Sequence, residues 1–134
     1  MEVKITERGW AGHFICSDRC LFHRNTLIEY ANKKWVVSTV GNMVDIHAYG
    51  YPDKVIIDTI GYERYFETMA FEADSNDKFL DADVSKQLDF DSEWSISEPW
   101  KEKEANDMHE AVIKELSIKI QSQTIPLTCP YNGY

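Results

Sequence analysis

Hydrophobic and polar residues alternate along the first half of the chain in the pattern of half-buried β-strands. Val3 and Ile5 alternate with charged or polar neighbours near the start. Residues 26–30 and 34–40 are two runs of good strand formers, separated by the short segment 31–33. Two such runs around so short a segment predict a β-hairpin. Gly41-Asn42 predicts the turn that follows its second strand.

Strand signals continue to residue 71. Residues 43–47 form a short strand candidate, and the sequence Tyr-Gly-Tyr-Pro-Asp at 49–53 predicts a loop. Residues 55–60 are rich in β-branched side chains. Residues 64–71 favour a strand because Tyr65, Glu67, Met69 and Phe71 recur at every second position. We therefore expect residues 1–71 to be mainly β.

The last third of the chain carries one strong helical signal. Ser97 is a suitable N-cap residue, and Glu98 and Pro99 suit a first helical turn. The apolar residues that follow at helical spacing are Ala105, Met108, Val112, Ile113, Leu116 and Ile120. This pattern predicts an amphipathic helix over 97–122, preceded by an acidic loop region over 72–96 and followed by an irregular tail over 123–134.

These elements indicate an α+β fold. We expect a single domain over residues 1–134, in which an antiparallel sheet or meander from the N-terminal two thirds packs against one long C-terminal helix. The length of 134 residues suits one domain. With 43% hydrophobic residues, the chain can also bury a substantial core.

The charge of the chain limits the classes of partner that we expect it to bind. The formal net charge is −9 at pH 7, so we expect no direct binding to nucleic acid, whose phosphates are neutralised by basic residues. No apolar run approaches the ~20 residues of a membrane-spanning helix, so we expect no membrane partner. The N-terminus lacks the apolar stretch of a signal peptide, and the three cysteines suit a reducing compartment. We therefore expect a cytoplasmic protein.

The acidic excess lies mainly in the second half, because residues 72–134 carry fourteen of the 23 acidic residues and only six of the 14 basic ones. Apolar and aromatic side chains are interspersed among these carboxylates. Carboxylates can steer a basic partner, and aromatic side chains can anchor it. The leading hypothesis is a non-enzymatic protein that occludes the basic surface of a partner protein, such as a nucleic-acid-binding protein. The expected contact residues are Asp81, Asp83, Asp89, Asp91, Glu93 and Trp94.

A second hypothesis is a small metal-dependent or Cys/His enzyme. His13, Cys16, Cys20 and His23 lie within eleven residues, and all four are zinc-ligand types. If the flanking segments are strands, however, Cys16 points away from His13, and Cys20 points away from His23. A cysteine nucleophile with a histidine base is a related alternative, although neither cysteine lies in a known catalytic motif. The alternative is a purely structural role, in which the cysteines are small buried hydrophobic residues. Under the leading hypothesis, the protein has no catalytic residues and needs no cofactor. Under the second hypothesis, the cofactor is zinc.

A third hypothesis is a protein that binds or sequesters a small molecule. Arginine and aromatic side chains together can form a pocket for an anionic or planar ligand. The candidates in the β region are Arg19, Arg24 and Arg64 with Tyr30, Trp35, Tyr62 and Tyr65. The alternative is that these residues simply stack on the surface of the sheet.

Three stretches of the first half resemble known sequences: Arg-Gly-Trp-Ala-Gly-His-Phe at 8–14, residues 18–27 and residues 60–71. They are similar to small uncharacterised proteins carried by bacterial phages and other mobile elements. The resemblance implies a bacterial host cell and an accessory role, such as an inhibitor of host defence of the anti-CRISPR type. It brings no site residues. Whether the protein acts as one copy or as a homo-oligomer is left open.

Overall fold

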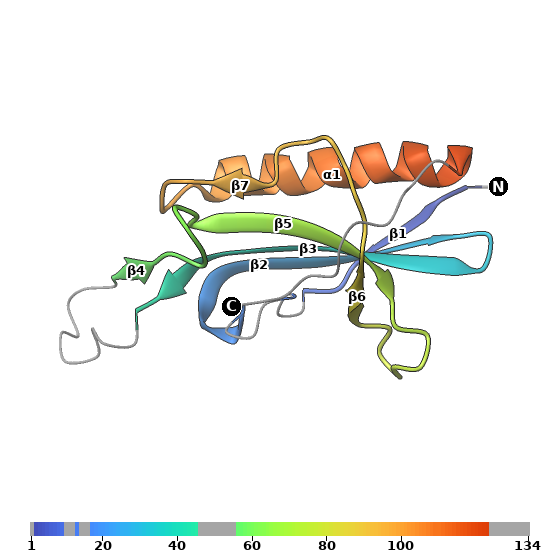
Figure 1. Cartoon of the computed structure of the whole chain (residues 1–134), viewed down its shortest axis with the longest axis horizontal. Coiled ribbons are helices and arrows are strands. Elements are labelled where there is room, and N and C mark those ends of the chain that lie inside the picture. The colour runs from blue at the N-terminus through green and yellow to red at the C-terminus, as the bar shows by residue number, and fades with distance from the viewer. Residues whose placement is uncertain (1, 10–12, 14–16, 46–55, 124–134) are drawn as a thin grey trace.

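The structure, a computed structural model, describes residues 2–9, 13, 17–45 and 56–123. In these parts of the chain, seven strands form one antiparallel sheet, and the helix α1 (Glu102–Ser122) lies lengthwise along one of its faces (Figure 1). This arrangement confirms the predicted α+β fold, with an antiparallel sheet packed against one long C-terminal helix. Within the same ranges, no helix has the length and apolar character to cross a membrane.

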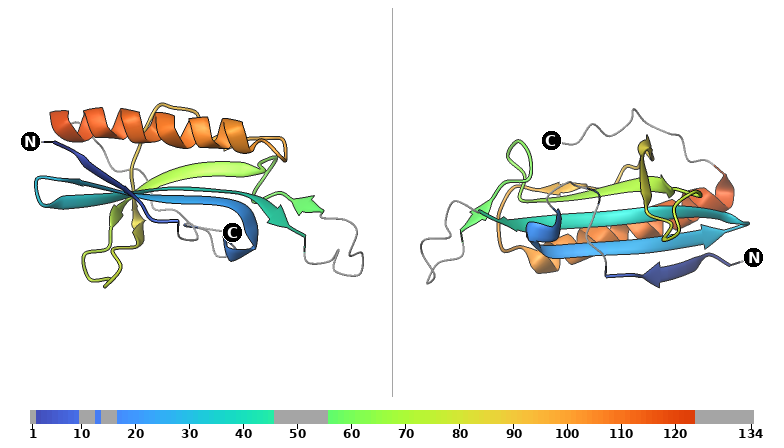
Figure 2. Two further views of the ribbon diagram at one scale, coloured as in Figure 1. Left: turned by 180° about the vertical axis from the view of Figure 1, so that it is seen from behind. Right: turned by 90° about the horizontal axis from the view of Figure 1, so that it is seen from below.

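The order of the strands in the sheet differs little from their order in the chain. The strands are β1 (Lys4–Glu7), β2 (Cys20–Tyr30), β3 (Lys33–Val44), β4 (Ile57–Asp58), β5 (Phe66–Ala73), β6 (Ala82–Gln87) and β7 (Ser95–Ile96). A short 3-10 turn, Ser17–Arg19, precedes β2. Strands β1, β2, β3, β5 and β6 follow one another across the sheet, while β4 pairs with β3 and β7 pairs with β5 (Figure 2).

The predicted hairpin is confirmed as β2–β3. Tyr30 lies opposite Lys33, so Ala31 and Asn32 form a two-residue turn. Both turn residues have positive φ angles, 51° and 66°. Positive φ at both positions is the geometry whose twist matches that of the flanking strands. The prediction of a turn at Gly41-Asn42 is wrong, because β3 continues through both residues to Val44.

Asn42 explains why this position resembles a turn in the sequence. Its φ angle is 51°, which is irregular for a strand. Its side chain accepts a hydrogen bond from the backbone N–H of Trp100 (2.9 Å) and donates one to the carboxylate of Glu102 (2.6 Å). At Gly41, the ring of Phe66 occupies the space that a Cβ would need. The Gly-Asn pair therefore marks where β3 attaches to the start of α1 and to β5.

The acidic region 72–96 is not simply a loop. Ala82 lies opposite Ala73, Thr68 donates its N–H to the carbonyl of Trp94 (2.7 Å), and Ser95 lies opposite Glu67. Residues 82–96 therefore run antiparallel to β5 as a discontinuous edge of the sheet, in which β6 and β7 are the regular parts. The sequence pattern did not reveal this edge because charged residues interrupt its alternation.

The helix starts five residues later than predicted, at Glu102, while its end at Ser122 agrees with the prediction. Trp100 has a φ angle of 60°, in the left-handed region, so a right-handed helix cannot run through it from Ser97. After Ser122, Gln123 is also left-handed and donates its N–H to the carbonyl of Ile120. This geometry is a common end for a helix.

Strand β3 is buried on both of its faces. Toward α1, the main core combines apolar residues of the sheet and the helix: Ile28, Trp35, Val37, Ala70, Leu88, Val112, Ile113, Leu116 and Ile120. The opposite face of β3 carries Val36, Ser38 and Val40, all fully buried. The polar residues Ser38 and Thr39 therefore lie inside the protein, where each needs a hydrogen-bond partner.

Several sequence predictions fall wholly or partly outside the described residues. The loop at 49–53, most of the tail over 123–134 and part of the strand candidate at 43–47 belong to this group. Of the strand expected at 55–60, only Ile57–Asp58 is a strand within the described residues.

Candidate functional site

The structure separates the acidic residues that the sequence suggested as one contact surface. Asp81 precedes β6 and Asp83 lies within it, next to the end of β5 at Ala73. Trp94 instead lies beside Thr68. Ala73 and Thr68 are five positions apart in β5, which corresponds to about 17 Å along a strand. Asp89, Asp91 and Glu93 lie toward the Trp94 end of this edge. The six residues thus form two groups.

The segment 89–93 leaves the edge of the sheet and is anchored on α1 by Glu115. The Glu115 carboxylate accepts hydrogen bonds from the N–H groups of Asp91 (2.6 Å) and Ser92 (2.7 Å) and from the Ser92 hydroxyl (2.6 Å). Lys119 bridges the carboxylates of Glu115 (2.9 Å) and Asp91 (3.4 Å). Burial raises the pKa of Glu115, but these hydrogen bonds outweigh it and lower the pKa to about 2. Asp91 therefore helps to hold the segment in place.

A groove of about 440 Å³ lies between this segment and α1. We call it the acidic groove; it is lined by Ser92, Glu93, Ile96, Glu104, Asp107, Met108 and Ala111. Glu93, Glu104 and Asp107 supply carboxylates, while Ile96 and Met108 supply apolar surface. Asp107 also pairs with Lys103 (3.1 Å) on the exposed side of the helix. Of the predicted contact residues, only Glu93 lines the groove.

A second, smaller hollow of about 290 Å³ lies on the other side of the same segment, and Trp94, Asp89 and Phe90 are among its lining residues. Trp94 is 40% exposed. The guanidinium group of Arg64 lies 5.0 Å from the centre of the Trp94 ring, within the range of a cation–π contact. Asp89, Glu93 and Trp94 thus lie in or next to the segment 89–93, whereas Glu104 and Asp107, which also line the acidic groove, were not among the predicted contact residues. Their exposed positions on the predicted helix were the available signal.

A buried polar cluster on the sheet face opposite α1 joins Ser38, His13 and Glu67. The backbone N–H of His13 donates to Ser38 Oγ (3.1 Å), and Nδ1 of His13 lies 2.9 Å from the same oxygen. Nε2 of His13 lies 3.0 Å from Oε1 of Glu67, and Arg64 donates to the other carboxylate oxygen (3.2 Å). The side chains of His13 and Glu67 are fully buried.

Serine, histidine and carboxylate stand here in the order of a hydrolytic triad. A nucleophilic serine must present its oxygen to a substrate carbonyl. Ser38 is fully buried, and its oxygen already receives the N–H of His13. The cluster therefore holds His13 against the sheet through hydrogen bonds to Ser38. It also provides hydrogen-bond partners for the buried carboxylate of Glu67.

The four proposed zinc ligands are not brought together among the described residues. Cys16 lies outside these residues. His13 contacts Ser38 and Glu67, whereas Cys20 is buried with Val40, Met43 and Ile60. Cys20 and His23 are three residues apart in β2, so they face opposite sides of the sheet. Within the described part of the chain, no group of three or more His, Cys, Asp or Glu side chains is arranged to hold a metal ion.

The three arginines proposed for a ligand pocket have separate partners. Arg24 binds Glu7 (3.0 Å) and Glu110 (2.8 Å), and Arg64 binds Glu67. Arg19 contacts the sulfur of Met43 (3.4 Å). The arrangement does not direct these guanidinium groups toward Tyr30 and Trp35.

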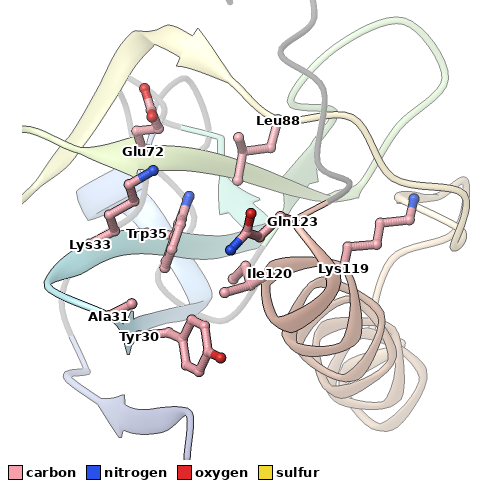
Figure 3. Close-up of a pocket in the computed structure, with 9 residues that line it drawn as sticks. All are labelled: Tyr30, Ala31, Lys33, Trp35, Glu72, Leu88, Lys119, Ile120 and Gln123. Carbon is pink, nitrogen blue, oxygen red and sulfur yellow. The ribbon is translucent and has the colours of Figure 1, made fainter. Parts of the chain in front are cut away.

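Tyr30 and Trp35 do line a pocket, but with lysine residues instead of arginines. It has a volume of about 450 Å³ and lies between the end of the β2–β3 hairpin and the C-terminal end of α1 (Figure 3). We call it the Trp35 pocket; its lining residues are Tyr30, Ala31, Lys33, Trp35, Glu72, Leu88, Lys119, Ile120 and Gln123. The size and the mixture of aromatic, apolar and charged groups suit a small ligand.

A second buried polar cluster lies in the core, centred on His109 of α1. This histidine is fully buried, and its Nδ1 and Nε2 lie 2.6 Å from Thr39 Oγ1 and 2.7 Å from Thr26 Oγ1. Thr39 also bonds with Thr68 (2.7 Å), and Thr26 donates its hydroxyl to Glu7. Burial, the largest cause, and the nearby charge of Arg24 together lower the pKa of His109 to about 3, although the charge of Glu7 opposes the shift. His109 is therefore neutral at pH 7.

Comparison with known protein families, with curated proteins and with solved structures finds no match to the chain. The acidic groove and the Trp35 pocket are therefore the two candidate functional sites of the described residues. Both are open to solvent, whereas the two histidine clusters are buried.

Proposed function

We infer that the protein is a non-enzymatic binding protein that occludes a basic surface of a partner protein through the acidic groove. The observation that carries this proposal is the placement of three carboxylates, from Glu93, Glu104 and Asp107, around a groove that also offers Ile96 and Met108. This combination matches the chemistry of an arginine or lysine side chain, which has an apolar stem and a cationic end.

A basic side chain of the partner would place its stem against Met108 and Ile96 and its cationic group among the carboxylates. Charge-assisted hydrogen bonds of this kind are stronger than those between neutral groups. Trp94 lies on the other side of the segment and offers an aromatic anchor of the type that dominates many interfaces. The net charge of −9 would also speed the approach of a basic partner.

The proposed partner is a nucleic-acid-binding protein, because such a protein has a basic surface that carboxylates can cover in place of phosphates. Occlusion of that surface would make this protein an inhibitor. The resemblance to proteins of phages and mobile elements adds host defence factors as the class of target. Competition between nucleic acid and this protein for one partner is a direct consequence of the proposal.

The test is affinity capture from a bacterial lysate at low and high salt, with partners identified by mass spectrometry and their affinity then measured with purified proteins. The groove variant is Glu93→Gln/Glu104→Gln/Asp107→Asn. The matched control is Asp81→Asn/Asp83→Asn/Glu98→Gln, which removes the same amount of charge at residues that do not line the groove.

We expect the groove variant to weaken binding by at least about tenfold and to reduce its salt dependence. The control variant should stay within about twofold of the unmodified protein, which corresponds to well under 1 kcal/mol. Equal weakening by both variants would show that only net charge matters and would contradict the groove. A captured partner that nucleic acid does not displace would contradict the occlusion mechanism.

A further inference from the structure

The Trp35 pocket contains a hydrogen-bond donor that has no partner in the described parts of the chain. Trp35 is 9% exposed. No hydrogen bond to its indole N–H is found among the described residues, and no buried side-chain nitrogen or oxygen there lacks a partner, so this N–H is open to solvent. Figure 3 shows the indole nitrogen on the same side of the ring as the ammonium group of Lys33. Trp35 therefore presents its one polar atom toward the side of the pocket on which Lys33 lies.

Lys33 supplies the unbalanced charge of the pocket. It lines the pocket and forms no ion pair with another described residue. The other lysine, Lys119, turns its ammonium group away from Trp35 (Figure 3) and binds Glu115 and Asp91. Glu72 pairs with Lys86 at 3.9 Å. One positive charge thus remains for a ligand, on the same side of the Trp35 ring as the indole nitrogen (Figure 3).

The remaining walls are apolar or amphipathic. Leu88 and Ile120 are 2% and 4% exposed and belong to the main core. Tyr30 adds an aromatic ring, and the amide of Gln123 lies beside Trp35 and Ile120 (Figure 3). A ligand would find an apolar floor on one side and two donors for an anion on the other.

We propose that the Trp35 pocket binds a small hydrophobic monocarboxylate. One carboxylate oxygen accepts the indole N–H of Trp35, the other lies against the Lys33 ammonium, and the apolar body covers Tyr30, Leu88 and Ile120. A monoanion is favoured over a dianion, because one unpaired cation cannot balance two negative charges and the Glu72 carboxylate at the rim repels a dianion more strongly than a monoanion. This site is separate from the acidic groove and does not depend on the proposed partner.

The test uses 3-phenylpropionate as the probe and isothermal titration calorimetry with the full chain as the measurement. The comparison compounds are 3-phenylpropan-1-ol, which lacks the charge, acetate, which lacks the apolar body, and phenyl phosphate, which is a dianion. We expect saturable binding of 3-phenylpropionate at one site, with at least about tenfold weaker binding of each comparison compound, as the loss of a charged hydrogen bond or a buried ring implies.

Two variants examine the donors separately. Lys33→Gln removes the cation, and Trp35→Phe removes the N–H while keeping an aromatic ring. Each should weaken binding of 3-phenylpropionate by about tenfold. The control Lys34→Gln changes the adjacent lysine, which does not line this pocket, and should leave the affinity within about twofold. Thermal unfolding of each variant shows whether it is folded, and Lys33→Gln decides the question if Trp35→Phe is not.

Three results would overturn the proposal. The first is the absence of saturable binding of 3-phenylpropionate. The second is equal binding of 3-phenylpropan-1-ol or tighter binding of phenyl phosphate, which would show that a monocarboxylate is not what the pocket recognises. The third is unchanged affinity in Lys33→Gln, which would place any bound probe elsewhere. None of these results bears on the acidic groove, so the two proposals fail or stand independently.

Discussion

Nδ1 of His109 lies 2.6 Å from Oγ1 of Thr39, which joins the middle of α1 to the central strand of the sheet. The neighbouring hydrogen bonds determine which group is the donor in this hydrogen bond between His109 and Thr39. Burial raises the pKa of Glu7, but hydrogen bonds from Arg24 and Thr26 and nearby positive charge lower it overall. Its ionised carboxylate can only accept, so Thr26 donates to Glu7 and accepts Nε2–H of His109. Nδ1 is then unprotonated and accepts the hydroxyl of Thr39.

This arrangement predicts that acid destabilises the protein through His109. Its pKa is about 3 in the folded protein, against 6.5 for the unperturbed group. As the pH falls below 6.5, the unfolded chain binds a proton that the folded protein does not bind, so the free energy of unfolding decreases. The expected loss from this residue is about 1.4 kcal/mol per pH unit until the pH reaches the folded pKa. Urea unfolding at a series of pH values measures it.

The matched variants for this measurement are His109→Gln and His23→Gln. The first should be less stable at pH 7 by about 2 kcal/mol, because the hydroxyls of the cluster lose part of their hydrogen bonding. Its stability should also fall less steeply with acid than that of the unmodified protein. His23→Gln, outside the cluster, should keep the steep dependence. Parallel pH profiles for all three proteins would contradict a depressed pKa at His109.

The position of His109 was available in the sequence as a pattern, although its role was not. It lies four residues after Ala105 and three before Val112, within the apolar stripe of the predicted helix. Glu67 likewise shares the alternation of Met69 and Phe71. In both cases the periodicity assigns a polar residue to a buried face. What the pattern cannot supply is the partner, because Thr39 and Ser38 lie far away in the chain.

The elements that local sequence determines were predicted well, and those that depend on distant contacts were not. The β2–β3 hairpin follows from its short turn, and the end of α1 follows from its apolar stripe. The start of α1 instead depends on Asn42, 60 residues from its partner Glu102. The acidic groove also combines residues from two separate elements. Charge alone could therefore indicate an acidic surface, but it could not show which carboxylates share it.

Glu115 should stabilise the segment 89–93 mainly through charge. Its folded pKa of about 2 is below the ordinary value of 4.5, so its contribution is present above pH 4.5 and is lost as the pH falls through 2. Glu115→Gln at pH 7 should cost about 1–3 kcal/mol, since the amides of Asp91 and Ser92 lose a charged acceptor. Hydrogen exchange at those two amides should accelerate, whereas Glu104→Gln, on the same helix, should leave them unchanged. Equal exchange in both variants would contradict this role.

Gly41 should be intolerant of any side chain because of Phe66. A Cβ at Gly41 would overlap the Phe66 ring, and that ring is fully buried and cannot move into solvent. We expect Gly41→Ala to destabilise the protein by about 3 kcal/mol in urea unfolding. Phe66→Leu provides space for the new methyl group. The double variant should therefore lose less free energy of unfolding than the sum of the losses in the two single variants. Simple additivity would show that the clash is relieved in another way.

The Ser38–His13–Glu67 cluster should stabilise the fold and should not act as a nucleophile. Removing the imidazole in His13→Ala leaves the buried Glu67 carboxylate with fewer partners, and we expect a loss of about 3 kcal/mol in urea unfolding. Ser38→Ala should cost about 1 kcal/mol, the usual contribution of one neutral hydrogen bond. A fluorophosphonate probe, which reacts with activated serines, should not modify Ser38, since its oxygen is buried and bonded to His13. Modification of Ser38 in the unmodified protein, absent in His13→Ala, would show instead that the cluster is a catalytic triad.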